Sequence, residues 1–138
     1  MNEQRKKIYV VEDERNIRIV MELIVKTLRH EVHGFSSGAD GLAAISSNCP
    51  DLILTDYRMP GGMDGAELIR AVREAVSQTV PIILISGSLA VLGRLQELLS
   101  DLENIEFISK PFSPRSVAVH IQRMLLTYQL STTGEENG

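Results

Sequence analysis

Residues 51–65 read DLILTDYRMPGGMDG. The run from Leu52 to Thr55 is apolar or β-branched, which predicts a buried strand, and it leads directly into the carboxylate of Asp56. The glycines that follow predict a loop. An aspartate at a strand end is commonly a turn former. The segment therefore leaves two alternatives: Asp56 shapes the turn, or it performs chemistry.

Short apolar runs of the same kind recur along the chain, and longer amphipathic stretches separate them. Near-continuous apolar runs are typical of parallel strands covered on both faces. The expected strands are 7–11, 31–35, 51–55, 80–86 and 105–109. The expected helices lie around 17–28, 38–47, 68–76, 92–102 and 114–125, the last with Ser113 as N-cap and Pro114 in first position. Five strands alternating with five helices predict a doubly wound α/β fold.

The composition is that of one ordinary globular domain. The chain has 138 residues, 43% hydrophobic and 23% charged. A net charge of −4 and only 4% aromatic residues argue against direct nucleic-acid binding. The single cysteine, Cys49, cannot form an internal disulfide, and no apolar run is long enough for a signal peptide or a membrane span. We expect a cytoplasmic, soluble protein with a lead at 1–6, a domain at 7–127 and a polar tail at 128–138.

Polar side chains follow four of the five expected strands. Glu12 and Asp13 follow the first, Asp56 the third, Ser86 the fourth and Lys110 the fifth. Ligands of open α/β sheets bind beyond the carboxyl ends of the strands, so these groups should meet at one edge. Clustered carboxylates repel one another unless a cation lies among them. The sequence therefore predicts a cation site at this edge.

The residue types at this edge suit phosphoryl chemistry. Mg²⁺ prefers hard oxygen ligands and commonly takes one or two carboxylates, which Asp13 and Asp56 supply. Lys110 can neutralise a phosphoryl group, and Ser86 can donate a hydrogen bond to it. Asp56 beside such a metal is a candidate nucleophile that would form an aspartyl phosphate. The expected function is phosphoryl acceptance at Asp56.

Four motifs in the chain resemble those of the receiver domains of two-component response regulators. They read VVEDE at 10–14, PDLILTDYRMP with MDG at 50–65, LISG at 84–87 and ISKPF at 108–112. The resemblance, which is to chemotaxis-regulator-like receivers, covers roughly residues 7 to 127. It implies a flavodoxin-like five-stranded parallel sheet of order 2-1-3-4-5. It also implies phosphoryl transfer from a histidine kinase or phosphotransfer protein, with Mg²⁺, or Mn²⁺ in its place.

The resemblance assigns roles to the positions that match. Asp56 corresponds to the phosphoacceptor and Lys110 to the phosphoryl-contacting lysine. Asp13, Asp56 and the backbone carbonyl of Arg58 correspond to metal ligands, and Glu12 to a residue that reaches the metal through water. The Lys110–Pro111 bond corresponds to one that is cis in the family.

Further positions correspond to the switch and to the partner surfaces. Ser86 matches the switch hydroxyl and Phe107 the switch aromatic; Arg58 and Ser88 match positions that tune the phosphoryl lifetime. A downstream protein or a second copy would bind the face of the fourth helix, fifth strand and fifth helix. Leu89 and Leu98 are left outside the buried stripe there. On the first helix Ile19 and Leu23 form a pair that is either a kinase-docking patch or scattered surface residues.

Two features depart from the family pattern. The segment MPGGMDG has one residue more than usual, so Gly61–Gly62 should make a longer loop, a form similar to that in receivers of hybrid histidine kinases. Phe107 replaces the usual tyrosine, so the switch aromatic has no phenol.

His30, His33 and His120 lack metal-ligand spacing, which favours surface or structural roles, and Cys49 needs no chemical role.

Three rival functions remain to be weighed. A Mg²⁺-dependent phosphohydrolase commonly needs a second aspartate two residues after the nucleophile, where Arg58 stands, and a cap domain that this sequence does not show. A flavin module needs a Ser/Thr-rich loop after the first strand, where this chain has acids. A phosphorylation-independent interaction module would bind its partner equally well after Asp56→Asn.

Overall fold

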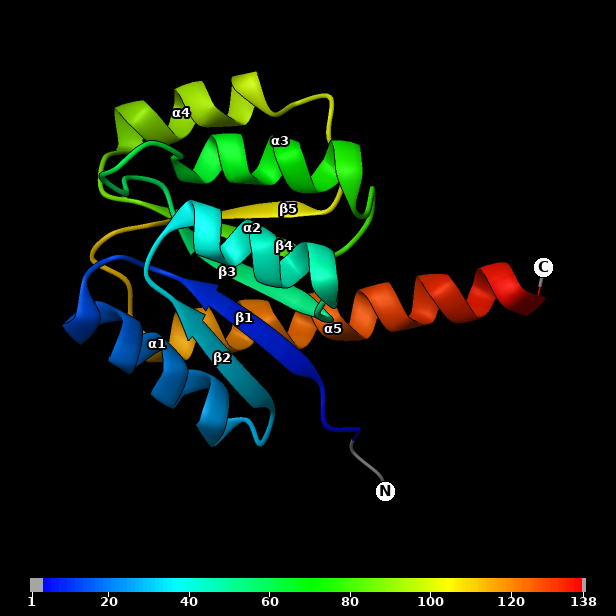
Figure 1. The fold of residues 1–138 in the computed structure, drawn as a ribbon. Helices are drawn as coiled ribbons and strands as arrows, with labels where there is room; N and C mark the ends of the chain where they lie inside the picture. The colour runs from blue at the N-terminus through cyan, green and yellow to red at the C-terminus, as the bar shows by residue number, and fades with distance from the viewer. Residues whose placement is uncertain (1–3, 138) are drawn as a thin grey trace.

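The fold is one parallel sheet between two layers of helices. The computed structural model describes the backbone of residues 4–137 and the side chains of residues 4–128. The strands pair in the order β2-β1-β3-β4-β5, and every pair is parallel (Figure 1). The strands are β1 Lys7–Val11, β2 Glu31–Phe35, β3 Leu52–Asp56, β4 Ile82–Ser86 and β5 Ile105–Ser109. The predicted α/β class and strand order are confirmed.

Helices α1 and α5 pack on one face of the sheet, and α2, α3 and α4 pack on the other (Figure 1). The helices are α1 Arg15–Thr27, α2 Gly38–Ser47, α3 Gly65–Ala75, α4 Leu89–Leu98 and α5 Pro114–Asn137. Met21 of α1 and Ile121 of α5 are fully buried in the first apolar cluster, and Ile45 of α2 and Leu68 of α3 in the second. The sheet is thus covered on both faces.

Burial is complete only in the middle of the sheet. Every residue of β3 and β4 is buried, whereas the edge strands β2 and β5 are mostly half-buried. The predicted two-sided burial therefore holds for the central strands, and it is weaker at the edges, where only one neighbouring strand is present.

Several element boundaries differ from the sequence prediction by a few residues, and three of them bear on how the chain packs. β4 begins at Ile82 rather than at residue 80, because Pro81 has no N–H to donate; its carbonyl still accepts from the Ile53 N–H at 3.0 Å. α4 ends at Leu98, so Leu102 packs from the turn that follows. α5 continues to Asn137, so the segment 128–138 expected as a polar tail is helical up to that residue.

The division into lead, domain and tail stays a prediction. The last turns of α5 extend past the edge of the sheet, as Figure 1 shows. Within the described residues, no helix combines the length and apolar character needed to cross a bilayer.

Candidate functional site

The polar residues predicted to meet do meet at the carboxyl edge of the sheet. Asp56 is the last residue of β3, Ser86 is the last of β4, and Glu12 and Asp13 follow β1. Because β1, β3 and β4 are neighbours, their ends converge. One carboxylate oxygen from each of Glu12, Asp13 and Asp56 lies within 4.8 Å of the others.

Asp56 is held by a lysine rather than by a turn. Its side chain is almost fully buried, and its Oδ1 lies 2.8 Å from the Nζ of Lys110. Burial raises the pKa of Asp56, the hydrogen bond and charge of Lys110 lower it in part, and the charge of Asp13 raises it again. A buried carboxylate thus lies directly beside a cationic partner, which is the arrangement a nucleophilic carboxylate needs.

Lys110 is fixed from both its backbone and its side chain. Its N–H donates to the carbonyl of Ser86 at 2.7 Å, and the bond to Pro111 is cis, as the resemblance implied. Burial would lower the pKa of Lys110, but the hydrogen bond to Asp56 and the nearby acids together raise it. The amine is thus held as an ammonium directly beside Asp56.

Glu12 has a buried carboxylate with one unsatisfied oxygen. Its side chain is 1% exposed, Oε2 accepts the N–H of Glu14 at 3.1 Å, and Oε1 has no hydrogen-bond partner among the described residues. Burial raises its pKa to about 7, and the charge of Asp56 adds to the effect. An orphaned oxygen beside two further carboxylates fits a hard divalent cation such as Mg²⁺. Glu14, whose N–H is bonded by Glu12, is the N-cap of α1, and its own side chain makes no cap hydrogen bond.

The loop that carries Glu12 and Asp13 is anchored by a residue that the sequence analysis missed. Nη1 of Arg18, on α1, donates to the carbonyl oxygen of Glu12 at 2.9 Å. The Glu12 N–H donates to the carbonyl of Phe35 at the end of β2 at 2.9 Å. A hydrogen bond from a side chain to a backbone carbonyl leaves no pattern in a sequence. The one available signal was that Arg18 stands one turn into the first helix, within reach of the loop that precedes it.

A second missed residue, Gly65, closes the loop after β3. Its N–H donates to the carbonyl of Tyr57 at 2.8 Å, and a Cβ at this position would lie 2.3 Å from the carbonyl oxygen of Asp56. Asp64 and Glu67 form a capping box that begins α3 at this glycine. The MDG motif therefore brings the start of α3 against the backbone of Asp56.

Gly61–Gly62 and Arg58 lie in the loop between β3 and α3, and Ser88 follows β4; Arg58 and Ser88 are the positions expected to tune the phosphoryl lifetime. Gly61 and Gly62 adopt φ values of +89° and +126°, a region that few other residues enter. Arg58 is exposed two residues after Asp56. Ser88 has a structural role that the sequence analysis did not state: it is the N-cap of α4, and its Oγ accepts the N–H of Val91. The lifetime roles of Arg58 and Ser88 stay predictions.

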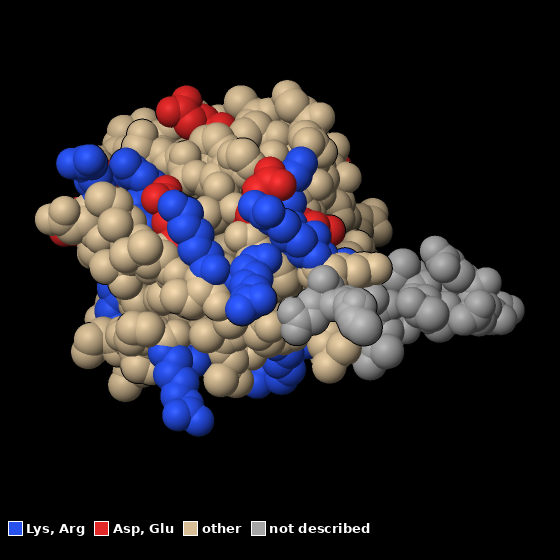
Figure 2. All heavy atoms as spheres, turned by 90° about the horizontal axis from the view of Figure 1, so that it is seen from below, with Lys and Arg blue, Asp and Glu red and all other residues tan. Residues whose placement is uncertain are grey.

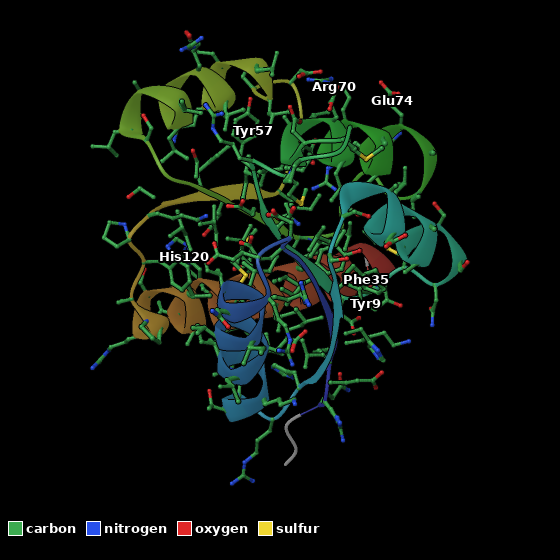
Figure 3. The ribbon with its side chains drawn as sticks, turned by 60° about the vertical axis from the view of Figure 1, so that its left-hand side comes forward. Tyr9, Phe35, Tyr57, Arg70, Glu74 and His120 are labelled. Carbon is green, nitrogen blue, oxygen red and sulfur yellow. The ribbon has the colours of Figure 1, made fainter. Side chains whose placement is uncertain are left out.

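The two switch positions are on β4 and β5, the two strands that follow the acceptor strand β3 in the sheet. Ser86 is 2% exposed, at the end of β4. Phe107, on β5, is half-buried and packs against the apolar cluster under α2, α3 and α4, which also holds Tyr57 (Figure 3). Their switch roles stay predictions.

The expected surface residues are exposed. On α1 the exposed fractions are 38% for Ile19 and 54% for Leu23. On α4 they are 76% for Leu89 and 59% for Leu98. These values confirm exposure but do not identify partners. Cys49 is exposed as well.

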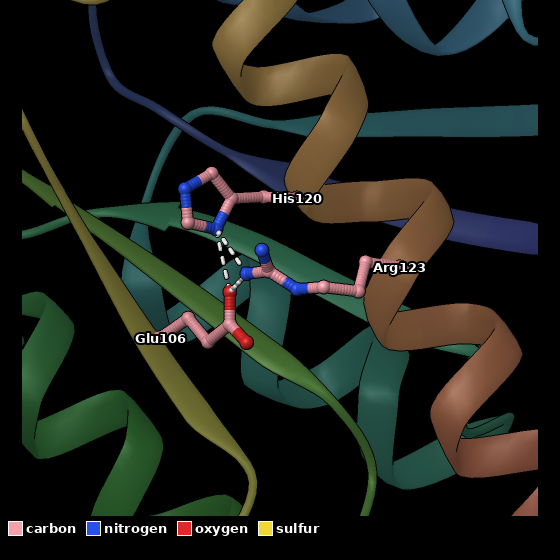
Figure 4. Close-up of polar contacts among 3 residues, drawn as sticks. All are labelled: Glu106, His120 and Arg123. Atoms are coloured by element: carbon pink, nitrogen blue, oxygen red, sulfur yellow. Dashed lines mark hydrogen bonds and ion pairs between the residues drawn. The ribbon is translucent and has the colours of Figure 1, made fainter.

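The histidines form polar contacts and lie apart from the carboxylate cluster. His30 accepts the N–H of Lys6 at 3.0 Å, and His33 lies 2.6 Å from Glu31. His120 on α5 and Arg123 contact Glu106 on β5, as Figure 4 shows. The predicted surface and structural roles fit these contacts.

Comparison with known proteins identifies the family. Residues 8–122 match the family model described as the response regulator receiver domain. The chain is 34% identical over 134 residues to the transcriptional regulatory protein CssR of Bacillus subtilis, covering 94% of this chain and 56% of that protein. It is 32% identical over 119 residues to ResD of the same species, covering 86% and 48%. The chain thus spans about half the length of the curated relatives it matches.

Solved structures agree with this relationship. NtrX from Brucella abortus aligns with a TM-score of 0.86 at 25% identity, covering 98% of this chain and 30% of that one. The receiver domain of the hybrid histidine kinase CckA aligns with a TM-score of 0.70 at 25% identity, covering 86% and 98%. Sequence match, strand order and site geometry lead to one conclusion: the chain belongs to the response regulator receiver domain family of two-component systems.

Proposed function

We propose that Asp56 accepts a phosphoryl group from a phosphohistidine of a histidine kinase or a phosphotransfer protein. The observation that carries this proposal is the buried Asp56 carboxylate, 2.8 Å from the ammonium of Lys110 and beside Glu12 and Asp13. A structural ion pair would need no further acids at the same point. The crowding of three carboxylates around one lysine is costly unless the site serves a charged ligand.

The donor set fits one Mg²⁺ ion, or Mn²⁺ in its place. Asp13, Asp56 and the backbone carbonyl of Arg58 would be direct ligands, and the unsatisfied Oε1 of Glu12 would be reached through water. When bound, the ion offsets the negative charge that gathers on the phosphoryl oxygens during transfer.

The transfer is a nucleophilic displacement at phosphorus. A carboxylate oxygen of Asp56 forms the new P–O bond while the P–N bond of the phosphohistidine breaks and its electron pair returns to the imidazole. The ammonium of Lys110 pairs with a phosphoryl oxygen, and the Ser86 hydroxyl donates to another. Water later hydrolyses the acyl phosphate, which restores Asp56 and releases inorganic phosphate. The chain thus catalyses only its own phosphorylation and dephosphorylation.

Phosphorylation of Asp56 then changes the surface to which a protein partner binds. Movement of Ser86 toward the phosphoryl group and of Phe107 toward the interior changes the surface of α4, β5 and α5. A downstream protein or a second copy of the chain binds that surface, and Leu89 and Leu98 are available there. The phosphodonor docks on α1, where Ile19 and Leu23 are exposed.

The test uses a small phosphodonor, so no partner is needed. The chain is incubated with acetyl phosphate and Mg²⁺ and examined by intact-protein mass spectrometry. We expect a gain of one phosphoryl group, lost again in EDTA-free buffer over time, and no gain for Asp56→Asn. Lys110→Ala should be labelled far more slowly. Equal labelling of wild type and Asp56→Asn would refute the assignment.

A further inference from the structure

A cluster of charged side chains that the proposed reaction does not use joins β5 to α5. The Oε1 atom of Glu106, on β5, lies 2.5 Å from Nδ1 of His120 and contacts Nη2 of Arg123, and both of these residues are on α5 (Figure 4). Nη2 of Arg123 is also 3.0 Å from Nδ1 of His120. The three atoms thus lie within hydrogen-bond distance of one another. We call these three residues the β5–α5 triad.

The three contacts of the triad cannot all be hydrogen bonds at the same time. An ionised carboxylate only accepts and a guanidinium only donates, whereas Nδ1 of a histidine donates when it carries a proton and accepts when it does not. With a proton, Nδ1 of His120 bonds to Glu106 and faces an N–H of Arg123 without bonding to it. Without that proton, Nδ1 accepts from Arg123, and its lone pair faces the carboxylate oxygen. His120 therefore has two alternative partners.

The charge of His120 decides between these two arrangements. Histidine is the side chain that most readily changes charge between about pH 5 and pH 8. A protonated imidazole has an N–H at both ring nitrogens, so it pairs with the Glu106 carboxylate and repels the guanidinium of Arg123. In the neutral ring with its proton on Nε2, Nδ1 accepts from Arg123, which is then the one cation paired with Glu106.

Glu106 is the acid for which the two α5 side chains compete. Residues 114–128 of α5 contain no acid, and Figure 2 shows lysine and arginine side chains outnumbering acidic ones on the face seen from below. Within residues 4–128, His120 has no hydrogen-bonded or ion-paired side chain besides Glu106 and Arg123. The other charged side chains on β1, on α1 and in the first turn of α5 are Lys7, Arg15, Arg18, Glu22, Lys26 and Arg115.

The triad is adjacent to the expected switch aromatic in the sequence. Glu106 directly precedes Phe107, and consecutive side chains of a strand face opposite sides of the sheet. Phe107 packs into the apolar cluster under α2, α3 and α4, whereas Glu106 reaches α5. His120 and Arg123 are about one turn apart on α5, so the two arrangements join β5 to different points of that helix. A change of partner therefore affects both β5 and α5.

We propose that the β5–α5 triad is a pH-sensitive switch, in which protonated His120 replaces Arg123 as the partner of Glu106 and releases the arginine to the surface. The side chain of Arg123 is already 52% exposed, so its release buries and uncovers little. Loss of the proton from His120 restores the Glu106–Arg123 pair. The inference does not depend on phosphoryl acceptance. Where that function holds, acidification adds a free arginine to the α4–β5–α5 face, where it can bind an acidic group of a partner.

The first experiment follows the triad by NMR in the unphosphorylated chain, across the pH range in which histidine titrates. The ring nitrogens of His120 report its protonation, the Nε–H of Arg123 reports its pairing, and the amide of Phe107 reports the position of β5. We expect the Arg123 and Phe107 signals to shift with the same midpoint as the His120 ring. Arg123 signals that do not change through that midpoint would overturn the proposal.

Two histidine-to-asparagine variants separate this response from other titrations. Glu12, whose pKa burial raises to about 7, titrates in the same range. His120→Asn keeps a polar amide but cannot become charged, so it should abolish the response of Arg123 and Phe107 to pH. His30→Asn is the matched control, because Nε2 of His30 lies 3.0 Å from Oε1 of Gln122 on the same helix, and it should retain the response. A response that persists in His120→Asn would assign the titration to another group and refute the switch.

Double-mutant cycles then measure which pair stabilises the fold at each pH. One cycle combines Glu106→Gln with Arg123→Gln, the other combines Glu106→Gln with His120→Asn, and urea titrations give the unfolding equilibrium constants. At about pH 8 we expect a coupling of about threefold between Glu106 and Arg123, which falls below about 1.5-fold at about pH 5.5. The coupling between Glu106 and His120 should change in the opposite direction.

Couplings that are equal at the two pH values would show that Glu106 does not change its partner. Both experiments use the unphosphorylated chain, so their results do not depend on whether Asp56 accepts a phosphoryl group. A failure of the switch and a failure of the proposed function can therefore be told apart.

Discussion

Gly65 allows two backbone segments to approach more closely than any side chain would permit. A Cβ there would lie 2.3 Å from the carbonyl oxygen of Asp56 and 2.9 Å from the Cα of Tyr57, and both atoms belong to rigid backbone. We expect Gly65→Ala to destabilise the fold by about 1–3 kcal/mol, the usual range for overpacking, and to slow labelling of Asp56 by acetyl phosphate. Urea denaturation and mass spectrometry measure the two effects.

Gly93 provides the matched control for this substitution. It lies inside α4, and a Cβ there would meet nothing within 4 Å. Gly93→Ala should raise the unfolding free energy by about 0.5–1 kcal/mol, because alanine loses less backbone entropy in a helix. If Gly65→Ala were as stable as Gly93→Ala, the close approach would not be what requires glycine at this position.

Arg18 holds the loop that carries the proposed metal ligands, and its own contact is with a backbone carbonyl of that loop. Its Nη1 fixes the carbonyl of Glu12 at 2.9 Å, one residue before Asp13. Residues that orient metal ligands commonly change metal affinity by an order of magnitude, so Arg18→Ala should weaken Mg²⁺ binding about tenfold. A Mg²⁺ titration followed by the amide chemical shifts of residues 12–14 gives the Kd directly.

Two companion variants separate this positioning role from general stability. Arg18→Lys keeps a donor of similar reach and should recover part of the affinity. Lys26→Ala, exposed near the end of the same helix, should leave the Kd unchanged. If Arg18→Ala had the wild-type Kd for Mg²⁺, or if Lys26→Ala weakened Mg²⁺ binding by the same factor, Arg18 would have no specific role in positioning the site.

At the scale of elements, hydrophobic periodicity predicted every strand and helix but not every boundary. Leu92, Leu95 and Leu99 kept the helical spacing that indicated α4, yet the helix ends at Leu98 with Leu99 as its C-cap, because packing rather than periodicity decides where the chain turns. The end of α5 was missed for the opposite reason. A polar sequence gives no apolar stripe, although it can continue an existing helix.

The sequence predicted the residues of the candidate site that stand at the ends of strands. It did not predict the residues that act through contacts with backbone atoms. Asp13, Asp56 and Lys110 were found because parallel strands bring their carboxyl ends together. Arg18 and Gly65 were missed because a bond to a carbonyl and a backbone contact depend on distances that no residue pattern records. The buried arginine of α3, Arg73, was missed as well, since charged residues are rarely buried.

Arg73 joins α3 to the segments that precede two strands. It is 5% exposed, and its Nη2 donates to the carbonyls of Val80 at 2.7 Å and Glu103 at 2.8 Å, just before β4 and β5. Its Nη1 donates to a third carbonyl, that of Ser77, at 3.2 Å, and a lysine, with a single nitrogen, cannot reproduce the two-nitrogen fork that bonds all three carbonyls. Arg73→Lys should therefore cost about 2–4 kcal/mol of unfolding free energy, from lost charged hydrogen bonds and an unsatisfied carbonyl.

Arg70, one turn earlier on the same helix, is the natural comparison. It pairs with Asp101 at 3.0 Å on the surface, where ion pairs contribute little (Figure 3 labels Arg70). Arg70→Lys should be clearly less destabilising than Arg73→Lys in urea titrations. Equal losses of unfolding free energy in the two variants would mean that the contacts of Arg73 with buried carbonyls stabilise the fold no more than a surface ion pair does.

For the whole molecule, the strand order that builds the core also concentrates negative charge at one edge of the sheet. Glu12, Asp13 and Asp56 lie within one small cluster, and Lys110 offsets only part of their charge. Burial and mutual repulsion raise the pKa of both Glu12 and Asp56, which means that the ionised cluster opposes folding near neutral pH. The fold therefore carries a local instability where the proposed reaction occurs.

This instability gives a test of metal binding that does not depend on phosphorylation. Without divalent ions, Asp13→Asn should have an unfolding free energy about 1 kcal/mol higher than wild type, and so unfold at a higher temperature, because one repelling charge is removed. In Mg²⁺ at about 100 times its Kd, wild type should gain about 2.7 kcal/mol and become the more stable protein. Glu74→Gln removes one charge from the exposed side of α3 and should respond to Mg²⁺ as wild type does (Figure 3). Equal stabilisation of Asp13→Asn and wild type in calorimetry would place the ion elsewhere, because the proposed site loses a direct ligand in that variant.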